Sequence, residues 1–284
     1  MESSPLPAGT HIVRRLLHQG FNATIKSSMA EIIVIGSACG FPVPRHGHSS
    51  VLLSANDKLI LVDAGEPCSR SMTEAGIRVD TIDAIMLTHG HSDHTGGLPM
   101  LIQAMWILDR QKPLAIFLPN ELSKPLQEWL SAVYLGAEFV PFELAFIPWE
   151  PKSVFDLNGL KVHPRETTHL ESLVRKFGPE RFKAYSLLVE SPEFRILFSG
   201  DLGSPIDLEQ QLAVSVDLLI SELTHFPPKE LWKFLGDKQV RKLLLTHLGL
   251  DLYGKEESLL EEARTALPAV EQVLVAKDGL RLAV

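Results

Sequence analysis

Four metal-competent side chains lie within six residues in the stretch His89-Gly90-His91-Ser92-Asp93-His94. This stretch follows directly on the apolar run Ile82-Asp83-Ala84-Ile85-Met86-Leu87, so we expect a strand to deliver it into a turn. Imidazole and carboxylate groups at this density suit a transition metal such as zinc, iron or manganese. In an alternative interpretation, Asp93 only caps a helix in a polar loop. That alternative leaves three histidines without a role, so the pattern favours a metal site.

The residues after this stretch predict a buried helix. We expect the helix to begin near Thr95, and residues 98–108 are apolar almost all round, which is typical of a helix inside a protein. Gly96 and Gly97 have no β-carbon, so the first helical turn can approach the histidines closely. The metal-competent stretch should therefore be supported by a rigid, buried helix.

Composition limits the kinds of partner. The formal net charge is −8, so nothing global attracts nucleic acid or an anionic membrane, and a long nucleic-acid partner stays an open question. Cys39 and Cys68 are too few for a disulfide framework, which fits a reducing cytoplasm. No apolar run approaches membrane-spanning length. We therefore expect a cytoplasmic protein without a membrane partner; the sequence leaves open whether it is a homo-oligomer.

The chain is expected to form one main domain. A strand-like run at 31–35 starts just after Met29, which predicts an N-terminal extension at 1–28 and a single domain at 29–284. Strands and helices alternate in this domain, as in an α/β fold. The hydrophobic pattern predicts helices at 69–75 and 121–134 and strands at 31–35, 49–54, 58–62, 114–118, 143–148, 153–156, 160–163, 185–190 and 194–198.

In the last third of the chain, three apolar strands each run into a polar side chain. The side chains are Asp201, Glu222 and His247, and reactive groups commonly collect at such strand ends. The four ligands of the first stretch exceed the needs of one catalytic ion and are too few for two. Two ions therefore fit better, with Asp201 and His247 as further ligands. A third histidine is also needed, and both His163 and His169 are candidates.

As a set, these residues resemble the metallo-β-lactamase superfamily. The resemblance is carried by the motif His89-x-His91-x-Asp93-His94, by Asp63 upstream, and by Gly200-Asp201 and Thr246-His247, and it extends from residue 31 to residue 284. It implies an αββα sandwich with a dinuclear metal site at one edge of the sheets. It also gives Asp63 a structural role, in which hydrogen bonds to its carboxylate tie the histidine loop.

The resemblance implies a seven-residue ligand set for two divalent metal ions. Zn²⁺ is the preferred ion, and Mn²⁺ and Fe²⁺ suit the same ligands. The third histidine of the family lies in a loop before the strand pair that leads to the bridging aspartate, which favours His169 over His163. The implied ligands are His89, His91 and His169 for one ion, Asp93, His94 and His247 for the other, and Asp201 as the bridge.

Several segments are similar to the ribonuclease Z and phosphodiesterase branch of this superfamily. The opening Gly36-Ser37-Ala38-Cys39-Gly40-Phe41-Pro42-Val43-Pro44-Arg45 matches its Gly-Ser/Thr-x-x-Gly-x-Pro-x-x-Arg pattern. The segment that ends at Thr224 resembles its His-Glu-Ala/Ser-Thr pattern, but Ser221 replaces the histidine. The helical segment that follows is shortened to 226–240, and no tRNA-clamping arm is evident between residues 97 and 169. These departures argue against tRNA processing and favour a small anionic or phosphodiester substrate.

The sequence predicts a hydrolytic mechanism. A metal-bridging hydroxide would attack, because coordination lowers the pKa of water from 15.7 to about 7. Asp93 would orient this nucleophile, and His225, paired with Glu222, would protonate the leaving oxygen. Basic residues around His169 offer phosphate contacts or, alternatively, form a solvated segment of mixed charge: Arg165, Arg175, Lys176, Arg181 and Lys183.

Two other functions compete with phosphodiester hydrolysis. The first is thioester or lactone hydrolysis of the glyoxalase II type, since such enzymes share the first motif, although residues 166–169 lack the flanking glycine and proline common there. The second is a non-hydrolytic metal-binding or redox scaffold. The intact ligand set argues against this second alternative.

Overall fold

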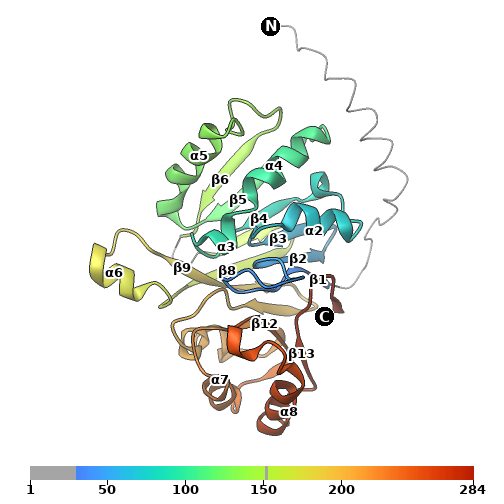
Figure 1. Cartoon of the computed structure of the whole chain (residues 1–284), viewed down its shortest axis with the longest axis vertical. Helices are drawn as coiled ribbons and strands as arrows, with labels where there is room; N and C mark the ends of the chain where they lie inside the picture. The colour runs from blue at the N-terminus through green and yellow to red at the C-terminus, as the bar shows by residue number, and fades with distance from the viewer. Residues whose placement is uncertain (1–29, 151–152) are drawn as a thin grey trace, which may run out of the picture.

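Two seven-stranded sheets pack face to face in the computed structural model, which describes residues 30–150 and 153–284 (Figure 1). The predicted extension at 1–28 lies outside these residues. The first sheet has the strand order β14 (Arg281–Ala283), β1 (Glu31–Gly36), β2 (Ser50–Ala55), β3 (Lys58–Val62), β4 (Ala84–Met86), β5 (Leu114–Leu118) and β6 (Leu144–Pro148). The second has the order β13 (Gln272–Val275), β12 (Val240–Leu248), β11 (Val216–Leu223), β10 (Arg195–Phe198), β9 (Ala184–Glu190), β8 (Leu160–Thr167) and β7 (Phe155–Leu157).

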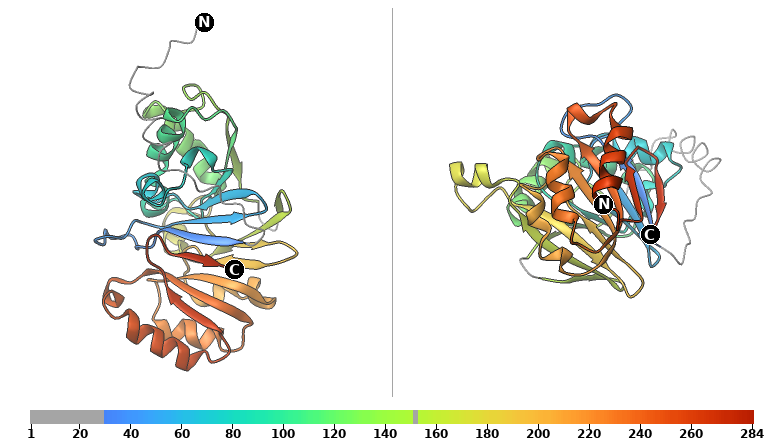
Figure 2. Two further views of the ribbon diagram at one scale, coloured as in Figure 1. Left: turned by 90° about the vertical axis from the view of Figure 1, so that its right-hand side faces the viewer. Right: turned by 90° about the horizontal axis from the view of Figure 1, so that it is seen from below.

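Helices cover the outer face of each sheet (Figures 1 and 2). The helices on the first sheet are α2 (Cys68–Glu74), α3 (Ser92–Thr95), α4 (Leu98–Ile107) and α5 (Ser123–Ala132), and those on the second are α7 (Pro228–Leu235) and α8 (Glu256–Ala266). A further helix, α6 (Glu171–Phe177), projects from the side of the sandwich (Figure 1). The predicted αββα sandwich is confirmed.

The alternation of side chains along β1 shows how the layers are held together. Ile33 and Ile35 join the apolar core beneath the helices of the first sheet, whereas Ile32 and Val34 join the core between the two sheets. Successive side chains of a strand point to opposite faces, so a continuous apolar run fills two cores at once. A third core lies between the second sheet and helices α7 and α8.

Two predicted boundaries close to the candidate site are wrong. Strand β8 continues to Thr167, so His163 lies within the strand and not at its end, because the antiparallel pairing with β9 extends through residue 167. Helix α3 begins at Ser92, before the predicted start near Thr95, so Asp93 and His94 lie on the helix itself. The pattern also did not predict β13, β14 or α8.

In the described part of the chain, no helix is both long and apolar enough to cross a bilayer.

A buried tryptophan links the sandwich core to the histidine stretch. The indole Nε1–H of Trp149 donates a hydrogen bond of 2.9 Å to the carbonyl oxygen of Leu87, two residues before His89. The ring stacks on Phe117 with centroids 5.2 Å apart. The backbone just before the histidine stretch is therefore fixed by a side chain that packs between the two sheets.

We expect Trp149→Phe to lower the free energy of unfolding by about 1–3 kcal/mol, because the Leu87 carbonyl loses its buried donor. Urea unfolding measures this change. Trp129→Phe is the matched control, since Trp129 is 39% exposed and the change there should stay within about 0.5 kcal/mol. Equal losses in the two variants would contradict the role given to Trp149.

Candidate metal centre

The carboxylate of Asp63 fixes the backbone from which the histidine stretch begins. Asp63 follows β3 and is buried; its Oδ1 accepts a hydrogen bond of 2.8 Å from the backbone N–H of Thr88. Its Oδ2 accepts from the Thr88 hydroxyl at 2.9 Å and from His94 Nδ1–H at 2.8 Å. These bonds match the structural role that the family resemblance implies for Asp63. One carboxylate thus orients both ends of the turn.

The same bonds set the tautomers of two histidines. The single hydroxyl hydrogen of Thr88 goes to Asp63, so His89 Nδ1–H donates to Thr88 Oγ1 across 3.1 Å. Because His94 also donates from Nδ1, both rings keep an unprotonated Nε2 in their neutral forms. Partners of this kind orient metal-binding histidines in proteins.

Strand ends of the second sheet bring the remaining candidates to the same place. His169 follows β8, Asp201 follows β10 and His247 lies near the end of β12. The Thr224 hydroxyl donates to the carbonyl oxygen of His247, and His247 Nδ1–H donates to Thr224 Oγ1 at 3.0 Å. His247 therefore presents Nε2 to the cluster in the same way as His89 and His94.

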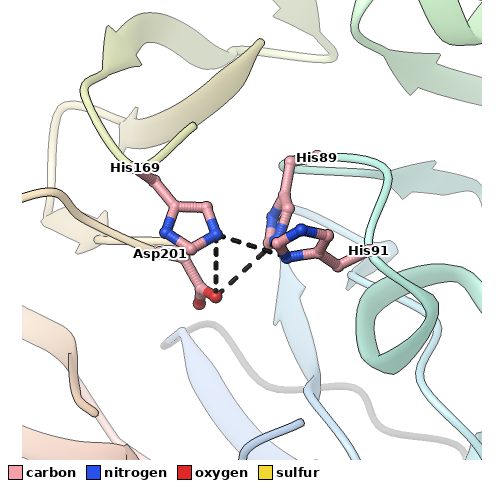
Figure 3. Close-up of side chains that lie close together, drawn as sticks. All are labelled: His89, His91, His169 and Asp201. Atoms are coloured by element: carbon pink, nitrogen blue, oxygen red, sulfur yellow. Dashed lines mark hydrogen bonds and ion pairs between the residues drawn. The ribbon is translucent and has the colours of Figure 1, made fainter. Parts of the chain in front are cut away.

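The seven predicted ligands form two groups that meet at Asp201. The ligand atoms of His89, His91, His169 and Asp201 lie within 4.8 Å of one another, as do those of Asp93, His94 and His247. Figure 3 shows the first group, in which His169 and His91 converge from opposite sides. Such His/Asp clusters are typical of the dinuclear site of metallo-β-lactamase proteins.

Asp201 points one oxygen at each group. Its Oδ2 lies 3.7 Å from His89 Nε2 and 3.6 Å from His169 Nε2, which belong to the first group. Its Oδ1 lies 3.4 Å from His94 Nε2 and 3.7 Å from His247 Nε2, which belong to the second. A carboxylate placed in this way is suited to bridge two ions.

Two buried nitrogens test whether a metal fits. His89 Nε2 and His94 Nε2 are fully buried and have no hydrogen-bond partner in the described residues. A buried polar atom without a partner costs about 1–3 kcal/mol, so proteins rarely leave one there without a function. Because each nitrogen faces a different oxygen of Asp201, a cation held at each of these two places would satisfy the nitrogen and the carboxylate oxygen together. The residues present therefore fit a metal.

The ionisation of most of these groups agrees with metal binding. Burial lowers the pKa of His89 well below its usual value and that of His169 to about 4, so both rings are neutral near pH 7. At Asp201 burial is outweighed by His247 and His94, which hold the pKa of the carboxyl well below its usual range. At His94 burial is outweighed by Asp201 and Asp63, and the pKa of that ring is raised. Neutral imidazole and ionised carboxylate are the forms that bind metals.

The predicted pair of His225 and Glu222 lies at the edge of the cluster. Glu222 is buried, and its Oε1 accepts from His225 Nδ1–H at 2.8 Å and from the backbone N–H of Leu202 at 2.6 Å. The His225 ring lies 4.5 Å from the His169 ring, centroid to centroid. Burial lowers the pKa of His225, but the hydrogen bond to Glu222 outweighs burial and raises it overall.

The structure separates the two candidates for the third histidine. His163 Nε2 pairs with Glu190 Oε1 at 3.0 Å on β9, and His163 is in neither of the two groups around Asp201. In the basic segment, two of the five cations pair with neighbouring carboxylates: Arg175 with Glu171 and Lys183 with Glu166. This arrangement fits the alternative interpretation, a solvated segment of mixed charge.

The sequence pattern missed Thr88 and Thr224. Each is a threonine at a strand end beside a candidate site residue: Thr88 directly precedes His89, and Thr224 follows β11 and directly precedes His225. Adjacency in the sequence is a weak signal, because it does not reveal which group the threonine hydroxyl will hydrogen-bond.

Comparison with known proteins places this geometry in a family. The family model described as "Anti-Pycsar protein Apyc1" matches residues 30–258. The chain belongs to this family. Ribonuclease Z of Metallosphaera sedula is 26% identical over 280 residues, which cover 84% of this chain and 95% of that protein. Ribonuclease Z of Agathobacter rectalis is 33% identical over 142 residues, but the match covers only 50% of this chain and 46% of that protein.

A solved structure shows the same fold. The metallo-β-lactamase fold protein YhfI from Bacillus subtilis superposes with a TM-score of 0.74 at 22% identity, and the match covers 90% of this chain and all of that chain. The chain is thus a metallo-β-lactamase fold protein related to ribonuclease Z, as the sequence motifs indicated.

We expect His169→Ala to lower the bound metal from about two ions per chain to about one, because the first group loses a ligand. Elemental analysis of the purified protein measures the ratio. His163→Ala is the matched control and should keep the metal content of the unchanged protein. Loss of metal in His163→Ala with full content in His169→Ala would reverse the assignment.

Proposed function

We propose that the chain is a metal-dependent phosphodiesterase that acts on small nucleotide phosphodiesters, with cyclic nucleotides as the first class to test. The observation that carries this proposal is the carboxylate of Asp201, which gives one oxygen to each ligand group. A two-metal site of this kind suits in-line displacement at phosphorus. Membership of the anti-Pycsar family and the relation to ribonuclease Z, an enzyme named for its action on RNA, support the same chemistry.

The ligand groups identify which residues would hold the ions. His89, His91 and His169 would hold one ion, with Asp201 shared, and Asp93, His94 and His247 would hold the other. Zn²⁺ suits these nitrogen and oxygen ligands best, and Mn²⁺ and Fe²⁺ suit them as well. When bound, the ions supply Lewis acidity that lowers the pKa of water to about 7 and offsets charge on the phosphoryl oxygens.

The side chains of the protein position the reactants. The Asp93 Oδ2 lies 3.2 Å from His247 Nε2, so this carboxylate is held at the second group and orients the attacking water there. His91 and His225 are the more exposed members of the cluster, and they mark the side from which a phosphodiester enters.

His225 supplies the proton for the leaving oxygen. Its Nδ1–H is engaged by Glu222, so the transferable proton is held at Nε2. Glu222 cannot turn away, because backbone N–H groups of Leu202 and Thr224 donate to its two oxygens at 2.6 and 2.9 Å. Glu222 is therefore a positioning residue that orients the acid.

Metal analysis and a substrate panel test the proposed function. We expect about two ions per chain, and turnover of cyclic nucleotides and bis-aryl phosphodiesters that is lost after chelation and restored by Zn²⁺ or Mn²⁺. Thioesters and lactones belong in the same panel. Turnover of those substrates alone would replace this proposal with the glyoxalase II-like alternative. A metal-loaded protein that hydrolyses none of them would support the scaffold alternative.

We expect His225→Ala to lower kcat about 10²- to 10⁴-fold for substrates with an alkoxide leaving group, because general acid catalysis contributes that much. For a p-nitrophenyl leaving group, which leaves without protonation, the loss should be several-fold at most. Steady-state kinetics on the two substrates measures the difference.

Metal content serves as the control for His225→Ala, because His225 also lies within 4.8 Å of Asp201 and His247 atoms that could share an ion. Unchanged metal content supports the general acid. Loss of an ion, with equal loss of turnover for both leaving groups, would make His225 a ligand.

A further inference from the structure

An exposed aromatic residue follows directly on a glycine that lies against the second ligand group. The backbone passes so close to Asp93 at Gly40 that a β-carbon added there would lie 3.4 Å from Asp93 Oδ2. The next residue is Phe41, whose surface is 60% exposed. A single exposed apolar residue is ordinary on a protein surface. Phe41 is a candidate for substrate contact because it follows directly on Gly40, which lies against a carboxylate of the metal cluster.

The loop that carries Phe41 is held firmly. His48 Nδ1–H donates to the carbonyl oxygen of Cys39 at 2.7 Å, and Cys39 is buried. Pro42 and Pro44 follow Phe41, and each fixes one backbone dihedral. An aromatic ring presented from a restrained loop loses little conformational entropy when a ligand binds.

A second exposed apolar residue lies after the other ligand of this group. Leu250 is 53% exposed and begins η5 (Leu250–Leu252), three residues after His247. The backbone N–H of Gly249 donates to the carbonyl oxygen of Leu223 at 3.1 Å, which fixes the start of this turn. Asp93 Oδ2 and His247 Nε2 lie 3.2 Å apart, so Phe41 and Leu250 each follow closely in the chain on a residue that lies at the second ligand group.

We infer that Phe41 is a specificity-determining residue that stacks on the nucleobase of the substrate, with Leu250 as a second apolar contact. This inference rests on the proposed function, because it assumes that a nucleotide phosphodiester occupies the cluster. Stacking on an aromatic ring is available to every base, so the contact favours nucleotides over phosphodiesters without a base and selects little among the bases.

The test compares a 3′,5′-cyclic nucleotide with the 3′,5′-cyclic phosphate of 1-O-methylribose, which lacks a base. We expect Phe41→Ala to raise KM for the cyclic nucleotide about 5- to 150-fold, with kcat changed less than about threefold, because one base–aromatic stack accounts for that range. For the base-free substrate neither constant should change. Phe41→Trp should retain a KM near that of the unchanged protein.

Tyr134→Ala is the matched control, since Tyr134 is 73% exposed just after α5 and is in none of the contacts of the cluster. Its kinetics should be unchanged for both substrates. An equal rise in KM for both substrates in Phe41→Ala, or no rise for either, would overturn the role of Phe41 while the phosphodiesterase stands. If the unchanged, metal-loaded protein cleaves no phosphodiester, the proposed function fails, and this inference fails with it.

Discussion

The buried carboxylate of Asp63 is the constraint on which the rest of the site depends. It accepts from the backbone and hydroxyl of Thr88 and from His94, so it fixes a turn whose other residues are the ligands themselves. A buried carboxylate is costly unless it is fully hydrogen-bonded, which restricts the turn to conformations that supply all three donors. Those conformations leave Nε2 of His89 and His94 facing the cluster. The need to hydrogen-bond one buried carboxylate therefore fixes the conformation of the histidine stretch.

The ligand set also couples the two halves of the sandwich. The histidine stretch follows β4 of the first sheet, whereas Asp201 and His247 come from β10 and β12 of the second. An ion held by these residues would join the sheets at one edge, in addition to the apolar core that fills the space between the sheets. A metal that binds only the folded arrangement stabilises that arrangement by mass action. Packing and metal binding therefore favour the same geometry.

The sequence pattern predicted the alternation of strands and helices and most of the ligand candidates because their signals are local, whereas the sandwich itself followed from the family resemblance. Apolar strands that end in Asp201 or His247 are visible in the sequence, and so is the spacing of the first stretch. The sequence alone left His163 and His169 open, since a histidine on a strand and one in a loop give similar patterns. The structure distinguishes them because His163 on β8 pairs with Glu190 on the neighbouring strand β9 and is in neither ligand group. Thr88 and Thr224 were missed for the same reason, because hydrogen-bond direction is a property of the fold.

Burial divides the site into two kinds of residue with different tasks. His89, His94 and Asp201 are almost completely buried, which removes water that would compete for their lone pairs. His225 and Phe41 are exposed, and these are the side chains to which we assign contacts with the substrate. Glu222 links the buried and the exposed residues, because its buried carboxylate accepts a hydrogen bond from the exposed His225. Phe41 and His225 make none of the hydrogen bonds that orient His89, His94 and His247, so changes at these two exposed residues can alter substrate preference without disturbing those ligands. Substrate preference in such a site therefore depends on the loops, and the chemistry depends on the strand ends.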